Sequence, residues 1–448
     1  MNPTLVHGDP HEAPHIPVAI VGGGACGLTA ALRLADHGVE CVVLERDAAP
    51  AGSTALSSGF IPAPGTRAQK ARGIDDSARQ FTADIQAKAK GTAAPHLAQA
   101  YAQAIGPALD ALEERHGLRF ELLEGFLYPG HSALRMHAVP EKTGAALMTR
   151  LQRACDAAGI AVLTNALARE LWADASGRIT GVGYVRPDGT LERLRCDAVL
   201  LACNGFGGNE HMVRELLPEM REATFAGHTG NDGSAIAWGR LLEARLADLG
   251  GYQGHGSWAV PQGQLMTWAV MAEGGLQLNA HGERFHDETG GYSEAAVAVL
   301  AQPGGTAWNV FDERLLALAR GFPDFALLEE AGAVRCARDA DALAAVIGCG
   351  AQQLSPDLAR LPPPYYAVRV TGALFHTQGG LDIDAQCRVL RQDGEPLSHL
   401  LAAGGAARGV SGNAVWGYLS GNGLLSAVAG GAIAADTMAR QLRAGSTR

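Results

Sequence analysis

Apolar and polar positions near the start of the chain follow one another in blocks that predict a βαβ unit. Residues Pro17–Val21 are a short apolar run, typical of a buried parallel strand. After a glycine-rich turn, Leu28–His37 has helical spacing and ends at Gly38. Glu40–Leu44 is the next apolar run. The order strand, helix, strand is one complete βαβ unit.

The same blocks continue along the chain and predict an alternation of helices and strands. Arg186–Gly189 has the composition of a hairpin turn between two of the strands. The expected helices cover residues 76–118, 143–158 and 421–442, and the expected strands lie within residues 160–163, 166–198 and 198–202.

Residues 250–360 differ from their flanks, because they hold three of the six tryptophans and mix strand and helix patterns. We predict that residues 251–360 are an inserted capping domain. Residues 17–250 and 361–448 would then form one discontinuous domain. Residues 1–16 are polar, contain several His and Pro residues, and predict a disordered leader.

Composition excludes several classes of protein. Of the 448 residues, 47% are hydrophobic and 18% charged, which is an ordinary globular balance. The net charge of −10 and the absence of a basic block argue against a nucleic-acid partner. No apolar stretch reaches 18 residues and no secretory signal is visible, so we predict no membrane span and a cytoplasmic location. The eight cysteines form no CxxC pair, so we predict reduced thiols and no metal site.

The turn after the first strand carries a dinucleotide-binding fingerprint. Gly22, Gly24 and Gly27 fit G-x-G-x-x-G directly between a strand and a helix, which is the context the motif requires. The first glycine permits the tight turn, the second admits the pyrophosphate and the third lets helix and strand pack. Glu45 closes the second strand, where an acid holds the ribose hydroxyls.

Two more segments favour FAD over a nicotinamide cofactor. Ala51–Gly59 is rich in small hydroxyl residues, whose backbone amides can lie against a flavin. Leu401–Gly405 ends a strand, and Gly421–Gly423 opens the last helix with an N-terminus suited to a flavin carbonyl. No second fingerprint follows a strand, so FAD is the expected sole redox cofactor.

Together these stretches resemble the fumarate reductase/succinate dehydrogenase flavoprotein-like family, which includes the 3-ketosteroid dehydrogenases. The resemblance covers nearly the whole chain after residue 16. It implies an α/β fold: a Rossmann-like (GR2-type) FAD-binding domain with an inserted α+β capping domain, and substrate between the two. The matching pieces are Val18–Glu45, Gly52–Gly59, Leu200–Asn209, Gly230–Gly233, Leu278–Phe285 and His376–Gly380.

The resemblance also implies which residues bind FAD. Some members attach FAD covalently through a histidine after the second strand, but Ala51–Gly59 contains none, so the implied FAD is non-covalent. The implied contacts are Gly22, Gly24, Ala25, Cys26, Gly27, Glu45, Arg46, Gly52, Ser53, Thr54, Ser57, Ser58, Gly59, Ala168, Asn204, Gly205, Asp232, Gly404, Gly405, Gly423 and Leu424.

Within this family, the site residues depart from the fumarate reductase pattern. The position of the proton-donating arginine holds Tyr292, and a cap segment that carries Glu and Arg in those reductases reads Trp268–Met271. The C-terminal segment that would offer a carboxylate-binding arginine, Gly412–Ser420, has none. Without arginines two carboxylates lose charge-assisted bidentate bonds, so fumarate is a poor candidate substrate.

The ketosteroid dehydrogenase pattern fits better. Tyr292 and the pair Tyr418 and Ser420 look like its tyrosine after the Arg-Phe motif and its C-terminal Tyr-x-Ser. The resemblance implies that Ser420 and the nearby backbone polarise the ketone oxygen of the substrate. Tyr292 would take the α proton with the help of Tyr418, which requires a lowered pKa of Tyr292. The β hydrogen would leave as hydride to flavin N5, giving an α,β-unsaturated ketone.

Two histidines leave a substrate with a carboxylate as an alternative. His376 and His255 match reductase histidines, so a small oxocyclohexane carboxylate would suit both halves of the pocket. Tyr292 could instead be a core tyrosine, Tyr418 and Ser420 a pair that caps the last helix, and the histidines ordinary buried residues. The alternative functions are a reductase of a tricarballylate- or urocanate-like acid, and a flavin-bound sensor without turnover. The electron acceptor and the oligomeric state are not predicted.

Overall fold

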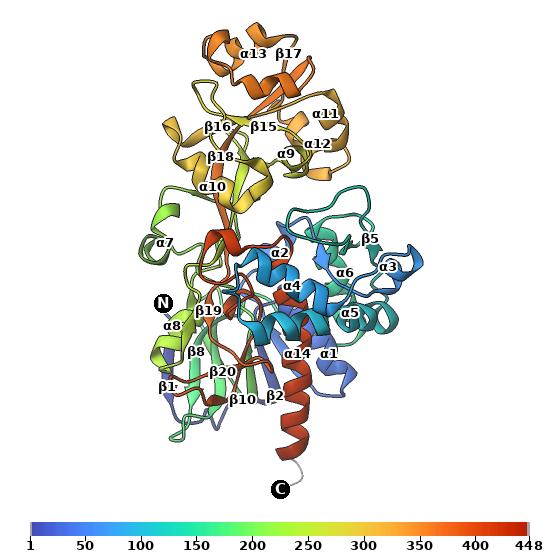
Figure 1. Cartoon of the computed structure of the whole chain (residues 1–448). Coiled ribbons are helices and arrows are strands. Elements are labelled where there is room, and N and C mark those ends of the chain that lie inside the picture. The colour runs from blue at the N-terminus through green and yellow to red at the C-terminus, as the bar shows by residue number, and fades with distance from the viewer. Residues whose placement is uncertain (1, 446–448) are drawn as a thin grey trace.

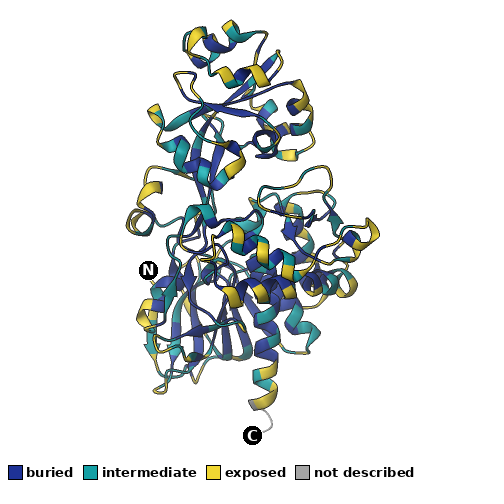
Figure 2. Cartoon of the chain, in the orientation of Figure 1, coloured by how far each residue is buried: buried dark blue, intermediate teal, exposed yellow. Residues whose placement is uncertain are grey.

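The computed structural model describes residues 2–445 and has two sheet-based layers, one above the other (Figure 1). Within these residues the lower layer is a nine-stranded sheet and the upper layer a seven-stranded sheet. Each has its own apolar core, seen as dark blue segments in Figure 2. The chain is therefore an α/β protein with two separately packed regions.

The predicted βαβ unit is confirmed. β2 (His15–Val21) and β3 (Cys41–Leu44) pair in parallel, with Val21 opposite Leu44, and α1 (Ala25–Asp36) connects them. β10 (Leu191–Leu201) extends the sheet beside β2, and β7 (Ala161–Leu163) extends it beside β3. Their carboxyl ends meet at one edge, where ligands of parallel sheets bind.

The N-terminal segment is ordered, so the predicted disordered leader over residues 1–16 is wrong for the described part. β1 (Thr4–His7) pairs in parallel with β8 (Leu167–Ala173), and β2 already begins at His15. The Trp238 indole also donates to the Thr4 carbonyl at 3.1 Å. The edge of β8 offers backbone groups that need partners, and the leader supplies them.

The rest of the lower layer follows the predicted alternation. β9 (Ile179–Val185) and β10 form an antiparallel pair joined by the predicted turn at Arg186–Gly189. α14 (Asn422–Gly445) packs along α1. The other helices of this layer are α2 (Gly52–Ala55), α3 (Arg67–Ala71), α4 (Ala78–Lys88), α5 (Pro95–His116), α6 (Gly144–Ala157), α7 (Glu210–Leu216) and α8 (Ser234–Leu241). Its other named strands are β4 (Ile61–Pro62), β5 (Glu121–Leu122), β6 (Met136–Ala138), β12 (Leu246–Ala247), β19 (Gly380–Leu381), β20 (Arg388–Leu390) and β21 (Pro396–Ala402).

Apart from the short strand β11 (Thr224–Phe225), the elements of the upper layer, or cap, begin with β13 (Tyr252–Ala259), close to the predicted limit at residue 251. β18 (Tyr365–Thr377) is hydrogen-bonded to both β13 and β16 (Thr306–Phe311). The predicted boundary at residue 361 is therefore too early, because β18, which follows it, still belongs to the cap's sheet. The remaining cap strands are β11 (Thr224–Phe225), β14 (Gln264–Leu265), β15 (Leu276–Leu278) and β17 (Arg335–Ala337), and its helices are α9 (Ala269–Ala272), α10 (Tyr292–Leu300), α11 (Glu313–Ala319), α12 (Pro323–Glu330) and α13 (Ala340–Ile347).

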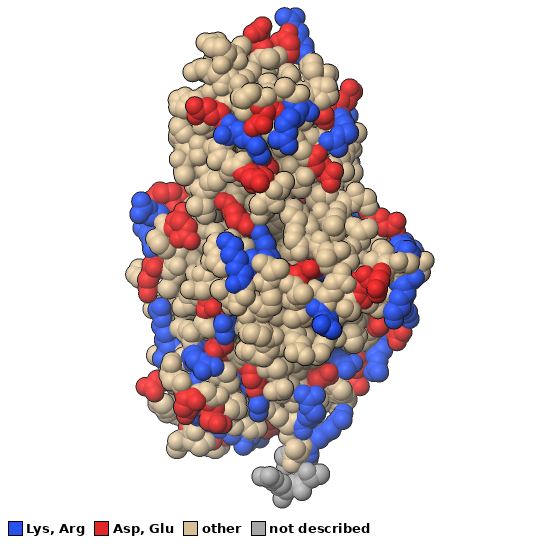
Figure 3. Space-filling view, viewed as in Figure 1, with Lys and Arg blue, Asp and Glu red and all other residues tan. Residues whose placement is uncertain are grey.

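The surface in the view of Figure 3 mixes acidic and basic side chains without one continuous basic area. Across residues 2–445, no helix is long and apolar enough to cross a membrane. No group of three or more His, Cys, Asp or Glu among these residues is placed to hold a metal ion.

Candidate flavin and substrate site

One large cavity runs from the carboxyl edge of the lower sheet to the underside of the cap. It encloses about 1990 Å³ of free space, open solvent included. Residues of both the lower sheet and the cap line it, so the cavity spans the boundary between the two layers.

The fingerprint glycines take two different roles. Gly24 precedes α1 and gives it no side-chain cap, and the first turn holds no acid. Apart from the Ala25 amide, which bonds Thr54, the start of the helix therefore offers amides and a positive end to a phosphate. A Cβ on Gly24 would meet only Thr54 Oγ1, at 3.7 Å, and would otherwise project into open space. A Cβ on Gly27 would lie 1.9 Å from the Gly22 carbonyl oxygen. Gly24 leaves room for ligand, whereas Gly27 lets helix and strand pack.

Glu45 holds the fingerprint turn from the end of β3. Its Oε2 accepts from the Gly23 amide at 2.9 Å, and its Oε1 accepts from the Asp47 amide at 2.9 Å. Burial raises the pKa of Glu45, and the two amides partly offset that rise. The side chain is 5% exposed and lines the cavity where an adenosine ribose is expected.

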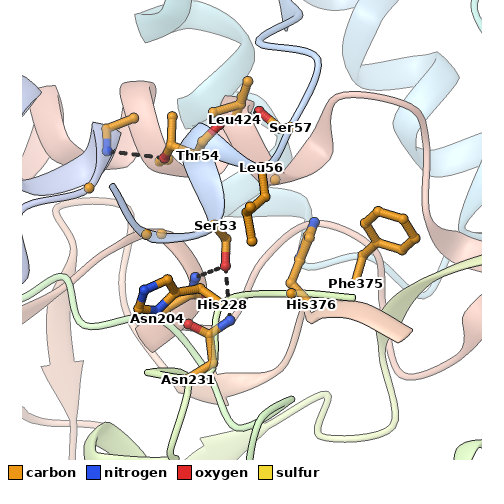
Figure 4. A pocket seen from close by; sticks show the side chains of 18 of the residues that line it. Ser53, Thr54, Leu56, Ser57, Asn204, His228, Asn231, Phe375, His376 and Leu424 are labelled. Atoms are coloured by element: carbon orange, nitrogen blue, oxygen red, sulfur yellow. Dashed lines mark hydrogen bonds between the residues drawn. The ribbon is translucent and has the colours of Figure 1, made fainter. Parts of the chain in front are cut away.

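The hydroxyl-rich loop is bonded to three neighbouring segments. Thr54 Oγ1 accepts from the Ala25 amide at 3.2 Å. Figure 4 shows the Ser53 hydroxyl accepting from the side-chain amides of Asn204 at 3.0 Å and Asn231 at 2.9 Å. The loop is thereby fixed against α1 and the end of β10, with its backbone along the cavity wall.

Most of the predicted cofactor residues come together in this cavity. Gly27 and Gly205 are the exceptions, because neither lines it. A Cβ on Gly205 would lie 2.0 Å from Thr377 Oγ1, so this glycine, like Gly27, is required by packing. The predicted residues that line the cavity are Gly22, Gly24, Ala25, Cys26, Glu45, Arg46, Gly52, Ser53, Thr54, Ser57, Ser58, Gly59, Ala168, Asn204, Asp232, Gly404, Gly405, Gly423 and Leu424.

The four predicted catalytic residues also share this cavity, at its cap end. Tyr292 begins α10 in the cap, whereas Tyr418 and Ser420 precede α14 in the lower layer. The rings of Tyr292 and Tyr418 are 6.0 Å apart, and those of His376 and Tyr418 are 5.5 Å apart. His255 stacks on Tyr292 at 4.7 Å. Residues from four distant segments thus form one cluster.

Comparison with known proteins agrees with this geometry. A family model described as FAD binding domain matches residues 17–424. The chain belongs to this FAD-binding family. Because the Gly24 cradle and the amide-rich start of α1 fit a pyrophosphate, we assign FAD as its cofactor. It is an FAD-dependent oxidoreductase.

Individual relatives are distant. The chain is 26% identical over 448 residues to NADH:fumarate oxidoreductase of Klebsiella pneumoniae (strain 342), covering 95% of this chain but only 48% of that protein. The open conformation of a flavocytochrome c3 fumarate reductase has a TM-score of 0.81 at 24% identity, covering 95% and 78% of the two chains. The 3-ketosteroid-Δ4-(5α)-dehydrogenase of Rhodococcus jostii RHA1 has a TM-score of 0.73 at 22% identity, covering 98% and 100%. At these identities the structural likeness shows the fold alone.

Electrostatics at the cap end differ from the expectation. Burial raises the pKa values of Tyr292 and Tyr418, so the predicted lowered pKa of Tyr292 is wrong. Desolvation of the phenolate outweighs the hydrogen bonding with Ser420 and Tyr418 that favours it. Burial also lowers the pKa of His255 to about 3 and of His376 to about 4. All four groups are therefore neutral at pH 7.

Several cavity residues escaped the sequence analysis. Asn231 lies inside Gly230–Gly233, so its place in a matched motif was a usable signal. Phe375 and Tyr128 carried none, although both line the cavity. Asp324, from the start of α12, accepts a hydrogen bond from the Ser58 hydroxyl at 3.1 Å. This bond joins the cap to the hydroxyl-rich loop Ala51–Gly59. Contacts between distant segments of this kind leave no trace in local spacing.

Gly24→Val tests the pyrophosphate cradle. Because the new side chain projects into open space, we expect the protein to fold while its dissociation constant for FAD rises about 100-fold, the equivalent of roughly 2.7 kcal/mol. FAD titration of the apoprotein measures the affinity, and circular dichroism checks the fold. Gly290→Ala, which also meets nothing within 4 Å, is the control and should bind FAD normally. Equal FAD affinity in Gly24→Val and the unaltered protein would contradict the assignment.

Proposed function

We propose that the enzyme dehydrogenates a neutral ketone between its α and β carbons, giving the α,β-unsaturated ketone. The observation that supports this most strongly is the absence of a cationic side chain at the cap end of the cavity, within the described residues that line it. Tyrosine and serine hydroxyls stand there instead. A ketone oxygen needs hydrogen bonds, whereas a dicarboxylate needs cations.

The charges along the cavity support a neutral substrate. Arg46, the only Arg or Lys among the described lining residues, lies at the opposite, fingerprint end and bonds Asp47 at 3.3 Å. His255 and His376 could supply positive charge only below about pH 3 and 4, where their pKa values lie. At pH 7 the two neutral imidazoles would offer a carboxylate N–H donors but no charge-assisted hydrogen bond. We favour a ketone without a carboxylate.

The start of α14 is suited to the ketone oxygen. The Gly423 amide donates to the Tyr418 hydroxyl at 3.5 Å, which leaves the Tyr418 proton directed elsewhere. Ser420 lines the cavity beside it. Two hydroxyl donors at the positive end of a 24-residue helix would stabilise negative charge that develops on the ketone oxygen.

We assign the transfer of the α proton to Tyr292. It faces Tyr418 across the cap boundary, and its raised pKa keeps it protonated at neutral pH. In the oxidative direction the phenolate takes the proton, so the rate should rise with pH. In the reverse direction the neutral phenol donates the same proton. Bound FAD supplies the acceptor for the hydride.

Anaerobic flavin reduction tests the proposal. The FAD-loaded enzyme is mixed with neutral cyclic ketones, the corresponding keto acids and succinate, and loss of the yellow flavin absorbance is followed. We expect neutral ketones to reduce the flavin fastest and succinate not at all. Reduction by succinate or keto acids alone would overturn the proposal.

A second candidate is the reduction of an unsaturated carboxylic acid. The raised pKa of Tyr292 suits a proton donor, and the matched Klebsiella protein is named a fumarate oxidoreductase. Reoxidation of a reduced dye by unsaturated acids, but not by unsaturated ketones, would favour this alternative.

A further inference from the structure

A buried ionic cluster lies beneath the start of α14. Arg135 donates to both oxygens of Asp76 at 2.9 Å and to Asp84 Oδ2 at 2.5 Å. The Arg135 and Asp76 side chains are 0% exposed and that of Asp84 is 13% exposed. Phe81 covers the guanidinium at 4.5 Å. None of these four residues lines the cavity, so the cluster acts on the site only through a neighbour.

His131 is that neighbour. Arg135 Nη1 lies 3.2 Å from His131 Nδ1, and an arginine can only donate, so Nδ1 is the acceptor. The ring proton is therefore on Nε2, which lies 3.0 Å from the Ser420 carbonyl oxygen and donates to it. His131 is 6% exposed and stacks on Phe81 at 6.0 Å, so the ring has little freedom to turn.

The bond reaches the cavity through the backbone of Ser420. Ser420 and Gly421 both line the cavity, and α14 starts at the next residue. Gly421 has φ +87°, and a Cβ there would lie 2.7 Å from the Pro62 ring. The peptide between Ser420 and Gly421 thus sits in a narrow space, and His131 holds its carbonyl oxygen on the side of the ionic cluster.

We propose that His131 is a positioning residue that fixes the peptide after Ser420, and with it the Ser420 hydroxyl and the first amides of α14 that face the substrate and the flavin. The part that concerns substrate rests on the proposed function, whereas the part that concerns the flavin does not. The chain from Asp76 through Arg135 and His131 to Ser420 is a rigid support, because each member is paired and buried.

Replacement of the donor tests this inference. His131→Phe keeps the ring packed on Phe81 but removes the hydrogen bond, whereas His131→Gln keeps a side-chain donor. We expect His131→Phe to lower kcat about tenfold or more with a smaller change in KM, because small misplacements of reacting groups are costly. We expect His131→Gln to recover most of the activity.

The reduction potential of bound FAD gives a readout that needs no substrate. In His131→Phe the amides of α14 are less well aligned, so we expect the potential to become more negative and the flavin spectrum to shift. His96→Phe is the control, because His96 also bonds a distant backbone carbonyl, Ile383 O at 3.0 Å, but Ile383, unlike Ser420, does not line the cavity. It should leave the potential unchanged. His131→Leu makes the same deletion with a smaller side chain should the Phe variant not hold FAD.

An unchanged potential and kcat in His131→Phe would overturn the inference, as would equal defects in the Phe and Gln variants. The potential separates this inference from the proposed function. If no ketone reduces the flavin but the His131→Phe potential still shifts, the positioning role toward the flavin stands and the ketone proposal fails.

Discussion

Tyr292→Phe should abolish nearly all turnover while the protein keeps its yellow FAD. A positioned group that transfers a proton contributes about 10²- to 10⁴-fold to the rate, and we expect a loss of that size in kcat. Phenylalanine preserves the ring that stacks on His255 at 4.7 Å and packs near Tyr418 at 6.0 Å. FAD content and thermal unfolding should therefore match the unaltered enzyme. Stopped-flow reduction of the flavin by the active ketone measures the effect.

The pH dependence of the same reaction checks the role of Tyr292. Its pKa lies above 10, so the phenolate fraction, and with it the dehydrogenation rate, should rise about tenfold per pH unit through neutral pH. In Tyr292→Phe this slope should disappear. Tyr365→Phe is the control, because Tyr365 is a buried cap tyrosine outside the cavity. Undiminished turnover in Tyr292→Phe would contradict the assignment.

Arg135→Met should destabilise the protein more than any surface substitution. It leaves the carboxylates of Asp76 and Asp84 buried without their cation, and breaking a buried pair in this way costs about 3–5 kcal/mol. We expect a marked fall in the midpoint of thermal and urea unfolding of the FAD-loaded protein. Because Arg135 also supports His131, activity below the unfolding temperature should fall as well.

Arg67→Met is the matched control for this prediction. Arg67 contacts three carboxylates, those of Asp110, Glu113 and Glu114, but its side chain is 59% exposed. Solvent screens such pairs, so the unfolding midpoint should hardly change. If Arg135→Met and Arg67→Met lowered the unfolding midpoint by similar amounts, burial of the ion pairs would not explain the stability that Arg135 contributes.

Local spacing is enough to predict the cofactor half of the site. Gly22, Gly24 and Gly27 stand within six residues, and the structure places the first two between β2 and α1 and the third in the first turn of α1, as the motif requires. The motif did not show that Gly24 faces the ligand whereas Gly27 is required for the packing of the helix on the strand. That difference depends on what lies opposite Gly27, namely the Gly22 carbonyl.

For the substrate end of the site, the sequence predicted which residues take part but not their protonation states. Tyr292, Tyr418, Ser420 and His376 were each singled out, and they do share the cavity. Their protonation was predicted wrongly for Tyr292, because a pKa depends on burial by segments far away in sequence. The order in residues 4–7 was missed for a related reason, since an edge strand is stabilised by the partner it pairs with.

The sequence by itself determined the βαβ unit, the glycine turn and the hydroxyl-rich loop, because each depends on the conformation of a few consecutive residues. Only the tertiary structure decided which groups meet across the cavity and how they are charged. The bond from His131 to the Ser420 carbonyl joins residues 289 positions apart, and that from Ser58 to Asp324 joins residues 266 apart. Such pairs form when segments far apart in the sequence pack together and exclude water, and neither event is encoded in local periodicity.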